Sequence, residues 1–127
     1  MSSGTDSRDD VSPKAGATPG PEGQGQAAAA RVWAQFHDVI FDRLAAVEKA
    51  ANALRRATLT PEVRQKAVLE AHRLAGSLGM FGLAEGTQVA REIEHLLSEQ
   101  GVLAPEAPHR LMELSAALRQ MLEKGPA

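Results

Sequence analysis

The sequence predicts an all-α protein, an antiparallel four-helix bundle with the possibility of an extra short helix at its N-terminus. After residue 26, apolar residues recur at intervals of three and four, which is the spacing of one face of a helix. No segment alternates apolar and polar residues with a period of two, so strands are not expected. Short proline- or glycine-containing breaks separate the periodic segments, as expected for antiparallel neighbours in a bundle.

The first 26 residues differ in composition from the rest, and we expect them to form a disordered tail. They hold five of the 11 glycines and three of the seven prolines, and Val11 is their only β-branched aliphatic residue. Such a segment cannot bury enough apolar surface to offset the entropy lost on ordering. The folding unit is therefore predicted to span residues 27–125.

Residues 27–57 contain no proline or glycine and predict one long helix, or a short helix that runs into a longer one. After a break at 57–60, Thr60 is expected to cap a second helix that begins at Pro61, carries Glu62 in its first turn and ends near Gly79. The predicted core sides of these two segments are Trp33, Phe36, Ile40, Leu44, Val47, Ala51 and Leu54 in the first, and Val63, Ala67, Ala71, Leu74 and Leu78 in the second.

A third helix should follow a glycine-bearing turn at 79–82, with Gly101 as its C-terminal cap. The last helix is predicted over about 105–124, stopping at Gly125 and Pro126. The predicted core sides are Leu83, Gly86, Ala90, Ile93 and Leu97 in the third helix, and Leu111, Leu114, Leu118 and Met121 in the last.

Composition excludes several classes of protein. A length of 127 residues suits one domain and leaves no room for a separate cofactor-binding fold. The absence of cysteine excludes a thiol nucleophile and any Cys-ligated metal site, and it fits a reducing, cytoplasmic location. A net charge of −2 argues against a nucleic-acid partner. No apolar run is long enough for a bilayer and no signal peptide is recognisable, so no membrane association is expected.

His72 stands out because it points about 140° away from the core side of its predicted helix. The positions around it are aliphatic or bare rather than charged, and they comprise Val68, Leu69, Ala75, Gly76 and Gly79. Glycine inside a helix costs about 1 kcal/mol relative to alanine, and Gly76 lies where its missing side chain would leave the imidazole uncovered. A lone helical histidine is more often an incidental surface residue, but this surround favours a docking or reactive one.

The run His72-Arg73-Leu74-Ala75-Gly76-Ser77, followed by Phe81-Gly82 and by Ala90 and Ile93-Glu94, resembles the active-histidine hairpin of the histidine-containing phosphotransfer (HPt) domain family. The match is strongest over 71–94, and the predicted bundle extends it over 27–125. It implies a phosphorelay carrier in which His72 accepts a phosphoryl group on Nε2 from a response-regulator receiver domain, or from a hybrid sensor histidine kinase, and passes it on.

The resemblance also implies a monomer without a cofactor of its own, because the partner receiver supplies Mg²⁺, its aspartate and a lysine. Catalysis of phosphoryl transfer is mostly positioning and charge stabilisation, so the carrier needs little more than an accessible imidazole. Nothing resembles an ATP-binding domain, so autokinase activity is not expected. The expected motif and docking surface consist of Val68, Leu69, Ala75, Gly76, Ser77, Gly79, Phe81 and Gly82.

One position departs from the family pattern, because Ala75 stands where a lysine is common. Arg73, which points about 100° from His72, and Arg91 on the next helix are the candidates to supply the missing cation, although either could equally be a solvated surface residue. The missing lysine leaves a second hypothesis open, in which the chain is an adaptor that docks receiver domains without being phosphorylated.

Two Glu-x-x-His pairs, Glu92–His95 and Glu106–His109, raise a third and less favoured hypothesis, a metal-binding bundle. Glu92 and His95 flank the core side of their helix rather than lying at its centre, and His109 follows a proline near a helix start. No metal site is therefore expected. His37 lies at the edge of a core stripe and is expected to be incidental.

Overall fold

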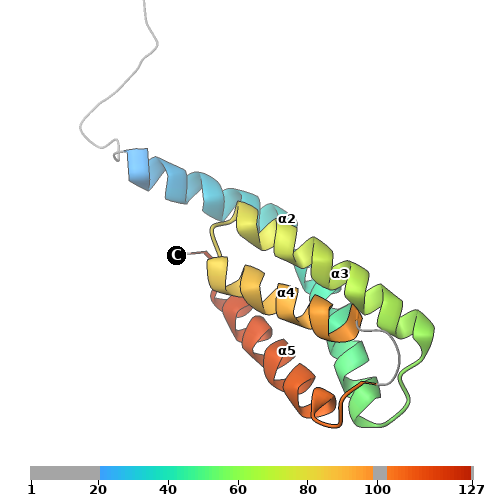
Figure 1. Cartoon of the computed structure of the whole chain (residues 1–127). Helices are drawn as coiled ribbons and strands as arrows, with labels where there is room; N and C mark the ends of the chain where they lie inside the picture. The colour runs from blue at the N-terminus through green and yellow to red at the C-terminus, as the bar shows by residue number, and fades with distance from the viewer. Residues whose placement is uncertain (1–20, 99–102, 127) are drawn as a thin grey trace, which may run out of the picture. The chain divides into compact units, whose positions relative to one another are not determined.

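The computed structural model describes residues 21–98 and 103–126, and within these ranges it contains four helices and no strand (Figure 1). The helices are α2 (Pro21–Arg55), α3 (Pro61–Met80), α4 (Ala84–Ser98) and α5 (Ala107–Lys124). The predicted all-α class is confirmed. The chain divides into two units, residues 1–31 and 32–127, and the following description concerns the second unit, apart from the start of α2.

Helix α2 is a single continuous helix that begins at Pro21 rather than near residue 27. Residues 1–20 of the predicted tail lie outside the described residues, and no separate short helix precedes the long one within the described range. Most of the predicted core side is buried, including Ile40, Leu44 and Val47. Phe36 is exposed, contrary to the prediction, because Trp33 fills the space at this end by packing edge-on against Phe81 with ring centroids 5.0 Å apart.

The two ends of helix α3 are set by residues that are adjacent to them in the chain. The Thr60 side chain accepts a hydrogen bond from the Val63 amide at 3.2 Å, as predicted for an N-cap before Pro61. The helix continues through Met80, one residue beyond the predicted end. Gly82 then adopts a positive φ of 73°, which glycine tolerates best, and Leu83 donates a backbone hydrogen bond to the Leu78 carbonyl.

Helices α4 and α5 complete the core with the predicted leucines, apart from one register difference. Leu122 is buried and Met121 only partly so, because the buried face of α5 continues from Leu118 with a step of four residues. Helix α5 begins at Ala107, slightly later than predicted, and the predicted cap Gly101 lies outside the described residues. The fully buried large side chains come from all four helices: Ile40, Leu44, Val47, Leu74, Leu78, Ile93, Leu97, Leu111, Leu118 and Leu122.

Side-chain contacts join the neighbouring helices in an antiparallel arrangement. Arg119 of α5 binds the Glu48 carboxylate of α2 through two nitrogens at 2.5 and 2.9 Å, and its guanidinium lies over the Phe41 ring. The hydrogen bond that Arg119 donates to Glu48 raises the pKa of Arg119, which therefore keeps its charge at any ordinary pH. None of the described helices has the length and apolar character needed to span a membrane.

Candidate functional site

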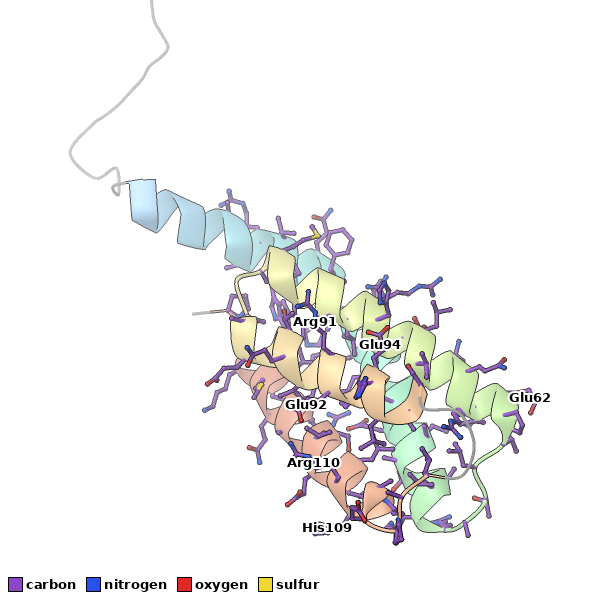
Figure 2. All side chains as sticks on the ribbon, viewed as in Figure 1. Glu62, Arg91, Glu92, Glu94, His109 and Arg110 are labelled. Atoms are coloured by element: carbon purple, nitrogen blue, oxygen red, sulfur yellow. The ribbon has the colours of Figure 1, made fainter. Side chains whose placement is uncertain are left out.

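The site is built around His72, which lies in the middle of α3 with 71% of its side chain exposed. Its Nδ1 lies 3.0 Å from Oε2 of Glu94 on α4, and that carboxylate is 29% exposed. Figure 2 shows Glu94 on the side of α4 next to α3. The two residues meet because α3 and α4 form an antiparallel hairpin around the turn at Gly82. No described residue hydrogen-bonds Nε2.

This contact determines which ring nitrogen can react. An ionised carboxylate only accepts hydrogen bonds, so the Nδ1 that faces Glu94 must carry the proton. In a neutral imidazole the other nitrogen then holds a lone pair. The exposed Nε2 of His72 is therefore left with a free lone pair, and the ring is held by Glu94 in the way that second partners orient metal-bound or catalytic histidines.

The surface beside His72 is open and apolar. A Cβ built on Gly76 would meet no atom within 4 Å, so nothing in the described structure covers the imidazole from one turn further along α3. Leu69 and Met80 are exposed on the same side of the helix, and Met80 reaches 82%. Gly79 is also exposed, whereas Val68 is half-buried against the core.

Ala75 does not lie on this open surface, contrary to the prediction, since it is only 5% exposed. The residue sits about 60° from His72 toward α4, where its carbonyl accepts a hydrogen bond from the Thr87 side chain at 3.3 Å. A cation at this position could reach the solvent only along the α3–α4 boundary. The absence of the family's lysine therefore leaves this boundary without a basic group from α3.

The two arginines proposed as substitutes differ in their surroundings. Arg73 is engaged with Glu70, at 3.1 Å, on the outer surface of α3. Arg91 is exposed and has no hydrogen-bond or ion-pair partner among the described residues. It lies one turn before Glu94 on the α3 side of α4, as Figure 2 shows. Of the two, Arg91 is the arginine without a partner among the described residues.

The rest of the predicted motif shapes the hairpin and does not point at the imidazole. Ser77 accepts a hydrogen bond from Arg43 of α2 at 2.7 Å, so its hydroxyl is turned to the opposite side of α3 from Glu94. Phe81 packs against Trp33, and Gly82 provides the positive φ that ends the turn. These three residues fix the position of α3 relative to its neighbours.

In the two alternative histidine pairs, Glu92 and His109 contact residues outside the pair. Glu92 binds Arg110 at 2.8 Å, and this hydrogen bond raises the pKa of Arg110 (Figure 2). His109 lies 3.4 Å from Glu113 rather than joining Glu106 in a ligand set. Within residues 21–98 and 103–126, no group of three or more histidine, aspartate or glutamate side chains could hold a metal ion.

His37, expected to be incidental, stacks on the Phe41 ring at 4.4 Å between centroids and contacts Asp38 at 3.3 Å.

Glu94 is a candidate functional residue whose contact with His72 was not predicted, although it belongs to the matched motif. A signal for it exists in the sequence, because residues at similar distances from the turn of an antiparallel helical hairpin lie near each other. His72 lies ten residues before Gly82 and Glu94 lies twelve residues after it, so an acid on that face of the second helix is a candidate partner for the histidine.

Comparisons with known proteins agree with this geometry. The profile of the Hpt domain matches residues 31–124. The chain is similar to Protein RcaC of Microchaete diplosiphon, with 30% identity over 91 residues, which is 72% of this chain. The chain spans only 14% of the length of that protein. No solved structure matches the chain significantly. With an exposed histidine on the second of four bundled helices and a profile match over most of its length, this chain belongs to the Hpt domain family.

Proposed function

We propose that the chain is a phosphorelay carrier that exchanges a phosphoryl group between His72 and the aspartates of response-regulator receiver domains. The observation that carries this proposal is the pairing of Nδ1 with Glu94, which leaves an exposed Nε2 as the nucleophile. Membership of the Hpt domain family supports a histidine phosphotransfer role of this kind. In this role the chain is a carrier, and the receiver brings its own catalytic groups, including Mg²⁺.

The proposed transfer needs no proton to move. Nε2 of His72 attacks the phosphorus of the receiver's acyl phosphate, the N–P bond forms, and the P–O bond to aspartate breaks to release a carboxylate. The imidazole becomes positively charged, and the proton stays on Nδ1, where Glu94 stabilises it. The same protonated ring is a good leaving group in the reverse step, so one arrangement serves acceptance and donation.

Arg91 is proposed to support the phosphoryl group in place of the absent lysine. Its side chain is exposed, uncommitted among the described residues and one turn from Glu94, so its guanidinium can approach the phosphoryl oxygens. Arg73 is a weaker candidate because it is engaged with Glu70. In this arrangement both polar groups that assist His72 come from α4.

The receiver is proposed to dock over α3 and α2. In the described part of the chain, the most exposed large apolar side chains all belong to these two helices: Val32, Phe36, Val39, Leu69 and Met80. Arg43 of α2 contacts Ser77 of α3, and Val39 lies one turn before Arg43 on the same side of α2. The apolar surface beside His72 thus continues onto α2, and we call these five residues the apolar docking face.

The test of the carrier is phosphoryl transfer to the full chain from a receiver domain phosphorylated on aspartate. We expect an acid-labile, alkali-stable phosphohistidine on the wild-type chain and none on His72→Gln. Equal labelling of both chains would refute the assignment of His72. A receiver that binds the wild-type chain without any transfer would instead support the adaptor hypothesis that Ala75 motivates.

The docking face is tested separately with two variants that add the same charge. Met80→Glu places a carboxylate on the docking face, and Gln120→Glu places one on an exposed position of α5. Neither side chain is buried, so both variants should fold. We expect receiver binding to weaken about tenfold or more only for Met80→Glu, measured by isothermal titration calorimetry. Equal binding by both variants would place the receiver elsewhere.

A further inference from the structure

A concave site lies between α4 and α5, away from the apolar docking face. Its volume is about 620 Å³, within the range of sites that bind small molecules. Leu96 of α4, Leu114 of α5 and Leu103 of the segment before α5 provide an apolar lining. We call this site the α4–α5 groove. Of the residues that line it, the proposed phosphotransfer uses only Arg91.

Only some of the charged groups around the groove have ion-pair partners in the described part of the chain. Arg110 on the α5 side is held by Glu92 at 2.8 Å and by Glu113 at 3.6 Å. On the α4 side, Arg91 and His95 lie one turn apart, and neither has a hydrogen-bond or ion-pair partner among the described residues. The groove therefore presents a free guanidinium and a free imidazole along one wall.

The remaining acid of the lining is distant from Arg91. Arg110 of α5 pairs with Glu92 of α4. Since the two helices are antiparallel, Glu106, which lies one turn before Arg110, is level with Leu96, which lies one turn after Glu92. Arg91 and Leu96 are about 7.5 Å apart along the axis of α4. A negative group beside Arg91 would thus avoid Glu106, while an apolar body could extend over Leu96 and Leu103.

We propose that the α4–α5 groove binds a small amphipathic acid, with its anionic group on Arg91 and its apolar body against the leucine lining. Guanidinium groups bind carboxylates and phosphates through paired, charge-assisted hydrogen bonds, which gives the anionic head a defined position. His95, one turn further along α4, can donate a hydrogen bond to the same head. The apolar lining selects for a ligand with a hydrocarbon body over a simple anion.

Occupation of the groove would also affect His72, an extension that rests on the proposed function. Arg91 borders both sites, since it lines the groove and lies one turn from Glu94, the partner of His72. An acid bound to Arg91 would withdraw the cation proposed to support the phosphoryl group. The ligand should therefore slow transfer to His72 without touching the apolar docking face.

The binding test uses the unphosphorylated full chain, so that it does not depend on phosphotransfer. Octanoate is titrated into ¹⁵N,¹³C-labelled protein. Octylamine, which has a similar hydrocarbon chain but a positive charge, tests whether the negative charge is needed. Acetate, which has the carboxylate but no hydrocarbon chain, tests whether the apolar body is needed. We expect saturable shifts of the Arg91 side chain and the Leu103 methyl groups with octanoate alone, at a dissociation constant of about 1 mM. Absence of saturation, or equal responses to octanoate and octylamine, would overturn the proposal.

Matched variants locate the anionic head. Arg91→Gln should weaken octanoate binding about fivefold to tenfold, whereas Arg55→Gln, which removes another exposed arginine without a partner among the described residues, should leave it unchanged. Equal affinity of the two variants would overturn the assignment of Arg91. Octanoate binding to a chain that accepts no phosphoryl group would leave the groove established and the carrier function refuted. Transfer unaffected by saturating octanoate would refute the coupling alone.

Discussion

Replacement of Gly76 by alanine should make the protein more stable and a poorer phosphoryl acceptor. The position is inside α3, it is exposed, and a Cβ there would meet no atom within 4 Å. The substitution therefore adds helix propensity without a clash, a gain of about 0.5 to 1 kcal/mol in the free energy of unfolding. For a domain of this size, that gain corresponds to a rise of about 2 to 8 °C in Tm, measured by circular dichroism.

The functional half of the prediction follows from the position of Gly76 one turn after His72. The added methyl group intrudes where the receiver must approach Nε2, and transfer should slow about tenfold because phosphoryl transfer depends on close positioning. Gly86→Ala is the control: its Cβ would lie 3.0 Å from Cδ1 of Leu78, which is fully buried and has little room to give, so it should gain less stability. A Gly76→Ala chain that is less stable than wild type, or equally active, would refute this reasoning.

Three further substitutions test individual contacts. Glu94→Ala should release the His72 ring, lower the Nδ1–H population seen in ¹⁵N spectra and slow transfer about tenfold, whereas unchanged spectra would show that the carboxylate does not set the tautomer. Thr60→Ala removes the N-cap of α3 and should cost about 1 kcal/mol in urea denaturation, and a cost near zero would mean that Pro61 alone fixes the helix start. Arg119→Met removes the half-exposed pair with Glu48 and should cost no more than about 1 kcal/mol, with the difference from wild type shrinking as salt is added. A larger, salt-independent loss would point to packing on the aromatic ring instead.

Local signals in the sequence were sufficient for most of the fold. Thr60 followed by a proline determines a helix start through groups that are adjacent in the chain, and a glycine at 82 determines a turn through its own φ. The exposure of His72 was predictable for the same reason, since its angle to the core side depends only on helical geometry. The unbroken helix from Pro21 was harder to predict, because composition describes residues 21–26 as tail-like.

The errors occur where a second helix decides the outcome. Phe36 lies on the apolar side of α2, but it can be buried only if another helix covers it. At this end of α2 it is Trp33 that packs against Phe81, and Phe36 stays exposed. Ala75 falls between two faces of α3, and only the position of α4 determines that it is covered. The role of Glu94 depends in the same way on how the hairpin closes, which a periodicity argument along one helix does not contain.

The groups proposed to assist the chemistry at His72 and the surface proposed to recognise the receiver come from different helices. Both polar groups proposed to act on the phosphoryl chemistry, Glu94 and Arg91, project from α4, whereas the apolar docking face belongs to α3 and α2. With Ala75 in place of lysine, α3 contributes the nucleophile but no cation at the α3–α4 boundary. Partner preference could therefore change through substitutions on the docking face while the tautomer and charge at the histidine stay fixed. Conversely, a ligand on α4 could tune the chemistry without altering which receivers bind.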